Sequence, residues 1–273
     1  LIGSPFYARL VGGLRRPRHA VLGSDIVGTV DALGSGVQEF SIGDKIIGDC
    51  VMVRGGFAQY ACLPAADMTR VQNTLSDELA ACLPQAGGIA VSGTEGLKEG
   101  MRLLINGAGG GSGTMALQLA KASGAHVTAV DNGAKTDWLK SLGADEVIDY
   151  RSEDFTSSGM QWDRILDMVA TRGPASIARS LANGGVYSAS GGEVKILLSL
   201  LIGGLRYRLQ NKRIGMLLVP AGRELTERIM QMAAEGVLSP HIEDVLPLSS
   251  VPEALRRTGL GEVKGKLVIK PQL

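Results

Sequence analysis

A run of small residues at positions 106–113 is the part of this sequence with the clearest chemistry. Five of its eight residues are glycines, and it joins an apolar strand predicted at 103–106 to a helix predicted at 112–123. At such a turn the backbone N–H groups can face an anion, and the positive end of the helix dipole favours negative charge. We therefore expect the pyrophosphate of a dinucleotide to bind here, the alternative being a glycine-rich turn that is only structural. The expected contacts are Asn106, Gly107, Ala108, Gly109, Gly110, Gly111, Ser112 and Gly113.

Asp131 lies 18 residues after Gly113, at the end of the next predicted strand. An acidic residue at this spacing can accept hydrogen bonds from the hydroxyls of the adenosine ribose. The strand, the glycine loop, the helix and the downstream acid all occur at the spacing of a dinucleotide site, which makes the motif more specific than its glycines alone.

From Arg102 onwards, predicted strands alternate with predicted helices, and these elements must position the residues above. The alternation predicts an α/β fold with a doubly wound parallel sheet. Before Pro64, short β-rich runs separated by glycine turns predict a small β-barrel or sandwich. After Ala221 we expect a helix to about residue 235, a proline-punctuated segment, a short helix and a closing strand without a helical crossover. The predicted strands of the sheet are 103–106, 126–131, 146–149, 164–169 and 185–189, and its helices 112–123, 134–142 and 174–182.

Composition excludes several classes of protein. The 273 residues include 28 Lys and Arg against 27 Asp and Glu, and a net charge of +1 gives no broad field to attract nucleic acid. The longest strongly apolar run, 196–205, is shorter than the roughly 20 residues of a membrane span. Cys50, Cys62 and Cys82 lack metal-site spacing and are expected to be reduced core thiols, which is typical of a cytoplasmic protein.

Several motifs together resemble the quinone oxidoreductase and zeta-crystallin branch of the medium-chain dehydrogenase/reductase superfamily. The most specific one surrounds the glycine loop and reads Gly100-Met101-x-x-Leu104-x-x-x-Ala108-Gly109-Gly110-Gly111-x-Gly113, followed by Gln118 and Lys121. Others lie along nearly the whole chain in the family's order: Leu22-Gly23-Ser24-Asp25-Ile26-Val27-Gly28, Val37-x-x-Phe40-x-x-Gly43-Asp44, Gly55-Gly56-Phe57-Ala58-Gln59-Tyr60, Leu142-Gly143-Ala144-Asp145 and Gly265-Lys266-Leu267-Val268-Ile269.

This resemblance implies a domain organisation. A GroES-like substrate domain is expected at 1–78, a Rossmann NAD(P)-binding domain at 79–237, and a return to the GroES-like domain at 238–273. Relatives carry roughly one further third of the GroES-like domain before the point that matches Gly3-Ser4-Pro5. We therefore expect the GroES-like β-barrel to be incomplete at its N-terminus, which leaves the catalytic residues unassigned.

The resemblance also implies a zinc-free enzyme. Zinc alcohol dehydrogenases of the superfamily have His-Glu where this sequence has Ser24-Asp25, and a hydroxyl is a poor substitute for imidazole. A structural zinc needs four closely spaced cysteines, whereas the interval after Gly48 holds only Cys50 and Cys62. Without a metal the easier reaction is hydride donation to an electron-poor acceptor, a small-molecule quinone or α,β-unsaturated carbonyl (enone). A zinc-independent alcohol or aldehyde reductase and a cofactor-binding protein without turnover are the alternatives.

The choice of cofactor depends on opposing features. Asp131 favours NADH because a carboxylate repels a 2′-phosphate, whereas Lys135 resembles the lysine with which quinone reductases bind that phosphate in NADPH. The family favours NADPH, with NADH possible. Tyr150 resembles the tyrosine that lies against the adenine, and Ala189-Ser190 the loop beside the nicotinamide.

The apolar segment 196–218, which carries four inserted basic residues, is interpreted as a lid, a subunit contact or a plain amphipathic helix. The family implies a homodimer. We expect no nucleic-acid partner and no membrane span.

Overall fold

The computed structural model describes residues 21–51, 53–72, 74–220 and 222–271. Its internal contacts divide the chain into two compact units, Leu1–Gly88 with Pro220–Leu273 and Ile89–Val219. The domain boundaries expected from the sequence stay predictions, and residues 1–20 of the first expected domain lie outside the described residues.

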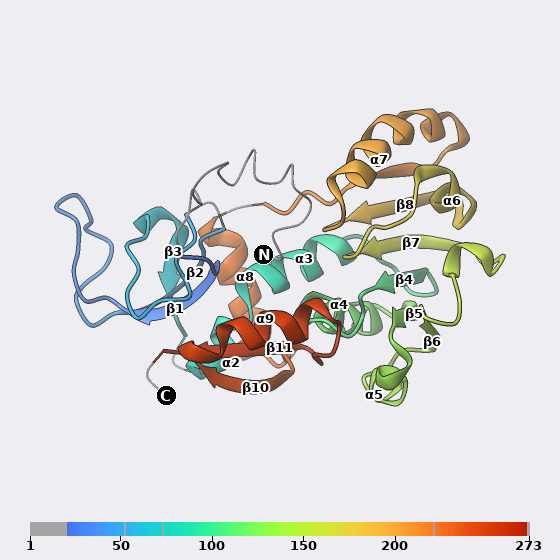
Figure 1. Ribbon diagram of the computed structural model, residues 1–273. Helices are drawn as coiled ribbons and strands as arrows, with labels where there is room; N and C mark the ends of the chain where they lie inside the picture. The colour runs from blue at the N-terminus through green and yellow to red at the C-terminus, as the bar shows by residue number, and fades with distance from the viewer. Residues whose placement is uncertain (1–20, 52, 73, 221, 272–273) are drawn as a thin grey trace. The chain divides into compact units, whose positions relative to one another are not determined.

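The unit Ile89–Val219 contains a six-stranded parallel sheet. The strand order is β6-β5-β4-β7-β8-β9 (Figure 1). The chain begins at the central strand β4, adds β5 and β6 on one side, and then adds β7, β8 and β9 on the other, which confirms the predicted doubly wound fold. Apolar runs form the central strands because a parallel sheet covered on both faces buries every side chain. The strands are β4 (Arg102–Asn106), β5 (His126–Asp131), β6 (Glu146–Asp149), β7 (Trp162–Asp167), β8 (Leu181–Ala189) and β9 (Arg213–Met216).

Helices connect these strands. α4 (Gly111–Ala122) buries its apolar side chains, Met115 and Leu117 among them, and the chain leaves it through Gly124 at φ +74°. The sheet's core includes Trp162, Phe155 and Tyr187, each at most 1% exposed. The other helices are α5 (Thr136–Ser141), α6 (Pro174–Arg179) and α7 (Val194–Tyr207).

The other unit contains two small sheets. β1 (Asp25–Thr29), β2 (Lys45–Asp49) and β3 (Met68–Arg70) form an antiparallel sheet. β10 (Ile242–Pro247) and β11 (Lys266–Lys270) are parallel. The helices are α2 (Asp77–Ala81), α8 (Arg223–Ala234) and α9 (Val251–Gly259), and α3 (Pro84–Thr94) continues into the second unit.

Four details correct the sequence analysis. The strand predicted at 164–169 is shifted to Trp162–Asp167, and the helix predicted at 174–182 ends at Arg179 because β8 already begins at Leu181 and not at 185. The closing strand does follow a helical crossover, α9, because strands as close as β10 and β11 can pair in parallel only through such a connection. Cys62 is exposed in an irregular segment and is no core thiol, unlike Cys50 and Cys82.

Among the described residues, no helix has the length and apolarity of a membrane span.

Candidate dinucleotide site

The glycine loop lies at the carboxyl end of β4, the central strand of the sheet. Gly107 turns the chain at φ +87°, and the N–H groups of Gly107 and Ala108 both donate to the carbonyl oxygen of Val130, at 2.9 and 3.1 Å. A Cβ on Gly113 would overlap the Gly107 carbonyl oxygen and the Ala108 backbone. Because those atoms are backbone and cannot yield, only glycine fits at 113.

The loop leads directly into α4, whose first residue is Gly111. The N-cap residue is Gly110, which has no side chain to cover the first N–H groups of the helix. Gly111 and Ser112 are half-buried in that first turn. A helix start of this kind, at the carboxyl edge of a doubly wound sheet, is suited to a pyrophosphate.

Asp131 ends β5 and contacts the loop directly. Its Oδ2 accepts a hydrogen bond of 2.7 Å from the Gly109 N–H, and its Oδ1 accepts one of 2.9 Å from the Asn132 N–H. The ammonium of Lys135 lies 3.1 Å from the same Oδ1, and both side chains are buried, at 4% exposure for Lys135 and 8% for Asp131. A Cβ on Gly109 would lie 2.6 Å from Lys135 Cδ. The structure therefore places Gly109, Asp131 and Lys135 in one contact group.

Tyr150 follows β6, the next strand outward. Its ring is 44% exposed, the guanidinium of Arg151 lies 5.9 Å from the ring centre, and its N–H donates to the Asp131 carbonyl oxygen at 3.2 Å. Tyr150 thus lies on the β6 side of Asp131 and is partly exposed, with the Arg151 guanidinium over its ring.

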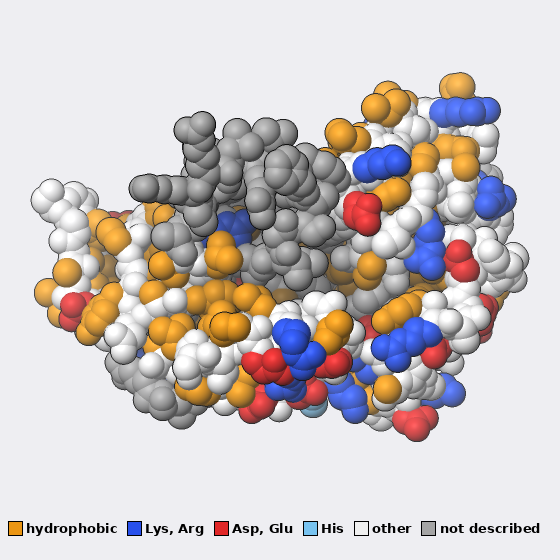
Figure 2. Space-filling model, viewed as in Figure 1, with side chains coloured by type: hydrophobic (Ala, Val, Ile, Leu, Met, Phe, Trp, Pro, Cys, Tyr) orange, Lys and Arg blue, Asp and Glu red, His pale blue; other side chains and the backbone are white. Residues whose placement is uncertain are grey.

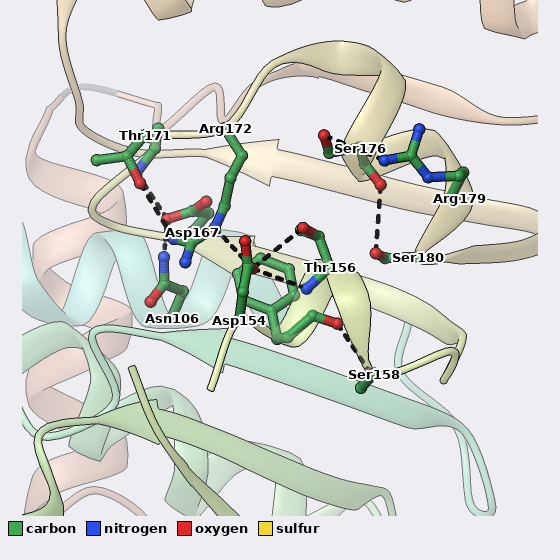
Figure 3. Close-up of polar contacts among 12 residues, drawn as sticks. Asn106, Asp154, Thr156, Ser158, Asp167, Thr171, Arg172, Ser176, Arg179 and Ser180 are labelled. Carbon is green, nitrogen blue, oxygen red and sulfur yellow. Dashed lines mark hydrogen bonds and ion pairs between the residues drawn. The ribbon is translucent and has the colours of Figure 1, made fainter. Parts of the chain in front are cut away.

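Ala189 and Ser190 end β8, on the opposite side of β4. Ala189 is buried, and the Ser190 N–H donates to the Asp167 carbonyl oxygen at 2.8 Å. The amide of Asn106, which we expected to contact the cofactor, instead points to the Asp167 carboxylate and donates to its Oδ1 at 2.8 Å (Figure 3). The structure thus brings all the expected contacts to the carboxyl edge of one sheet.

Asp167 and Tyr187 are the residues at this edge that the sequence analysis missed. Tyr187 donates its hydroxyl to Asp167 Oδ2 at 2.9 Å. Burial, and next the Asp167 carboxylate, raise the pKa of Tyr187 well above its usual value, so its proton stays in place. The two residues are 20 positions apart on different strands, and no local sequence motif indicates their contact.

The residues at the position of the superfamily's zinc ligands do not fit a metal. The two oxygens of Asp25 accept from the Gln85 N–H, at 3.1 Å, and from the Lys266 ammonium, at 3.0 Å. Cys50 is buried, its thiol lies 3.8 Å from Met68 Sδ, and burial, and next Asp67, raise its pKa to about 11. Within the described residues, no three His, Cys, Asp or Glu side chains group closely enough to hold an ion.

Comparison with known proteins identifies similar chains. A family model of alcohol dehydrogenase GroES-like domains matches residues 6–73, and one of zinc-binding dehydrogenases matches residues 142–269. A chloroplastic quinone oxidoreductase of Triphysaria versicolor is 30% identical over 262 residues, which cover 91% of this chain and 79% of that protein. The structure of the quinone oxidoreductase from Coxiella burnetii has a TM-score of 0.80 and 28% identity, covering 99% of this chain and 84% of that one.

A much longer protein is also similar. The mycocerosic acid synthase-like polyketide synthase of Mycobacterium tuberculosis is 31% identical over 268 residues, 92% of this chain. This chain spans 13% of the length of that synthase.

Proposed function

Because this chain belongs to the quinone oxidoreductase-like branch of the medium-chain dehydrogenase/reductase superfamily, we propose that it reduces a quinone or an enone by hydride transfer from NADPH, without zinc. The observation that carries the proposal is the contact group at the carboxyl edge of the sheet. There Asp131 accepts a hydrogen bond from Gly109 in the glycine loop, and the loop leads directly into α4.

The ion pair of Asp131 and Lys135 supports NADPH as the cofactor. A bare carboxylate at this position would repel a 2′-phosphate, but the ammonium 3.1 Å away neutralises it. Oδ2 of Asp131 keeps one lone pair beside its bond to Gly109, which allows it to accept one ribose hydroxyl. The neutral pair of Asp131 and Lys135 would therefore accommodate the 2′-phosphate of NADPH, and we expect NADH to be the weaker ligand.

The chain's residues would bind and orient the reactants. The N–H groups of the first turn of α4 would hold the pyrophosphate, because those of residues 107–110 already donate within the protein. Tyr150 would cover the adenine, and the segment Ala189-Ser190 would lie beside the nicotinamide. When bound, the dinucleotide supplies the hydride. Among the described residues, Asp25 is bonded to Lys266 and Gln85, which leaves it poorly suited to a metal that would acidify an alcohol and favours acceptors that are already electron-poor.

The test is oxidation of NADPH with three acceptors, a benzoquinone, an enone and a simple aldehyde, each with and without a strong chelator. We expect turnover with the quinone or the enone and no effect of the chelator. Turnover with the aldehyde alone would favour an alcohol or aldehyde reductase, and loss of activity with the chelator would contradict zinc independence. Cofactor binding without reduction of any acceptor would indicate a binding protein without turnover.

Cofactor preference is tested with Lys135→Met. Because this change leaves the Asp131 carboxylate uncompensated, we expect kcat/KM for NADPH to fall by about tenfold or more while that for NADH changes far less. Lys140→Met, an exposed lysine of the same helical segment, is the control and should leave the ratio unchanged. An unchanged ratio in Lys135→Met would remove Lys135 from the proposal.

A homodimer formed through the β9 end of the sheet is also part of the proposal. α7 exposes several large apolar side chains, Ile202 at 76% and Leu205 at 61% among them, and Leu209 just beyond it is 93% exposed (Figure 2). β9 is an edge strand paired only with β8 among the described strands. An apolar face beside an open edge is typical of a contact between identical subunits. Light scattering should give a dimer for the wild type and a monomer for Ile202→Glu.

We retain the cytoplasm as the proposed location.

A further inference from the structure

The carboxylate of Asp167 is fully buried at the end of β7 and accepts four hydrogen bonds. Oδ1 accepts from Asn106 Nδ2 at 2.8 Å, from the Val169 N–H at 2.9 Å and from the Ala170 N–H at 2.7 Å. Oδ2 accepts from the Tyr187 hydroxyl at 2.9 Å. All four donors are neutral groups, and they satisfy both oxygens of the buried carboxylate. We call Asp167, Asn106 and Tyr187 the Asp167 cluster.

The first bond of this cluster reaches the glycine loop. Asn106 is the last residue of β4 and directly precedes Gly107, and it is paired with Asp167 in the register of the two parallel strands. The Asn106 carbonyl oxygen also accepts from the Met168 N–H at 3.0 Å. Backbone and side chain of Asn106 therefore both connect the start of the glycine loop to the end of β7, and Figure 3 shows the side-chain bond.

The next two bonds fix the segment after β7. Ala170, held by its N–H, adopts φ +42°, a conformation that L-residues other than glycine rarely take. Met168 Cβ and Val169 Cγ2 both lie 3.4 Å from where a Cβ on Gly107 would be. This segment thus packs directly against the first glycine of the loop. Its far end is held by Arg172, whose Nε lies 3.0 Å from Asp154 Oδ1 and whose guanidinium stacks on Phe155 (Figure 3).

The fourth bond reaches β8. Tyr187 lies two residues before Ala189, and Ala189 is paired with Asp167 in the register of the sheet. The Ser190 N–H donates to the Asp167 backbone carbonyl. Asp167 is therefore joined both to the strand end that precedes the glycine loop and to the one that leads into Ala189-Ser190.

We propose that Asp167 is a positioning residue: it sets the spacing between the glycine loop and the Ala189-Ser190 segment, and so the position of the reacting nicotinamide carbon relative to the acceptor. The inference rests on the proposed function, since it assumes a dinucleotide that spans both segments. Asp167 itself is buried behind these segments and acts through them. A displacement of about 1 Å is enough to slow a positioned reaction severalfold to a hundredfold.

Tyr187→Phe is the most conservative test because it removes one hydroxyl and keeps the buried ring. The matched control is Tyr207→Phe, which also removes one tyrosine hydroxyl. Tyr207 is the last residue of α7 and lies outside the Asp167 cluster. Asp167→Asn is the second variant, because it keeps the shape of the side chain and removes its charge.

Hydrogen exchange of the protein without cofactor tests the coupling independently of any activity. In Tyr187→Phe and Asp167→Asn, peptides covering 107–113 and 168–171 should both exchange about tenfold faster than in the wild type and in Tyr207→Phe. Faster exchange in 168–171 alone, with 107–113 unchanged, would overturn the coupling between the two segments.

Kinetics test the positioning. In Tyr187→Phe the single-turnover rate of hydride transfer should fall about tenfold, with a larger kinetic isotope effect for NADPH deuterated at the transferred position, while the dissociation constant for NADPH changes by less than about threefold. An unchanged rate in an active protein would overturn this inference alone. A wild-type chain that binds NADPH but turns over no acceptor would overturn the proposed function, and the exchange experiment would still decide the coupling.

Discussion

Two buried carboxylates flank the central strand of the sheet, and they are stabilised in different ways. Asp131 ends β5 and Asp167 ends β7, the two neighbours of β4. Asp131 is paired with the ammonium of Lys135, whereas Asp167 is held by four neutral donors. The first arrangement yields a nearly neutral contact group on the side of the expected adenosine. The second joins a buried carboxylate to two side chains and two backbone N–H groups, and so organises the backbone around it.

The contrast indicates that the two carboxylates do different work. An ion pair can be replaced by two neutral groups of similar shape with little loss of stability, because its attraction and its desolvation nearly cancel. A carboxylate that four donors share has no equivalent replacement, since its removal leaves each of them without an acceptor. Asp167 should therefore matter more for the fold, and Asp131 with Lys135 more for the choice of cofactor.

The largest effect is expected for Asp167→Ala. The change leaves the Asn106 amide, the Tyr187 hydroxyl and two backbone N–H groups unsatisfied in a site that is 0% exposed, and we expect a loss of about 4 kcal/mol in the free energy of unfolding. Both tryptophans, Trp138 and Trp162, lie in the unit Ile89–Val219, so urea unfolding followed by their fluorescence reports on this unit.

Asp163→Ala is the matched control on the same strand. Asp163 accepts one bond of 2.8 Å, from the Arg102 N–H, in an exposed contact, and its loss should cost about 1 kcal/mol. Equal losses in the two variants would mean that the Asp167 cluster contributes no more than an ordinary surface hydrogen bond.

An intermediate effect is expected for Lys135→Met. It leaves the Asp131 carboxylate buried without its cation but still bonded to the N–H groups of Gly109 and Asn132, so we expect a loss of about 2 to 3 kcal/mol. The double variant Asp131→Asn with Lys135→Met should recover most of that loss, as measured by a double-mutant cycle on the same urea unfolding.

The Lys121–Asp145 pair is the exposed counterpart. Its side chains are 34% and 30% exposed and lie 2.8 Å apart, so Lys121→Met should cost about 1 kcal/mol or less. A loss in Lys135→Met as small as this one would contradict the buried ion pair, and a double variant no more stable than Lys135→Met would do so as well.

The sequence predicts the Asp131 side of this comparison and not the Asp167 side. The glycine loop and Asp131 are close in the chain, and their spacing indicates a dinucleotide site, to which the family resemblance adds Lys135. The parallel sheet around them is confirmed. The side-chain partners of Asp167, Asn106 and Tyr187, are 61 and 20 residues away, and no local pattern joins them. The specific contacts to a cofactor stay predictions.

The misplaced strand has the same physical origin. The apolar residues Met168, Val169 and Ala170 extend the pattern of the strand and predict that it continues to 169. The Asp167 side chain ends it instead, because it captures the N–H groups of Val169 and Ala170 and turns the chain to positive φ. The residue that the sequence analysis missed is thus also the residue that moved the strand end.

The smallest effect is expected for Ala170→Gly, at the point where the Asp167 carboxylate holds the backbone at φ +42°. Glycine takes this conformation without the penalty of about 1 to 2 kcal/mol that alanine incurs. Loss of a fully buried methyl group costs about 0.8 kcal/mol, so the net gain in the free energy of unfolding should be less than about 1 kcal/mol. Ala178→Gly, the same change at a buried position inside α6, should instead lose about 1 kcal/mol or more. Opposite signs in the two variants, measured by urea unfolding, would confirm that Ala170 is held in a strained turn; a loss of equal size in both would show that Ala170 adopts it without strain.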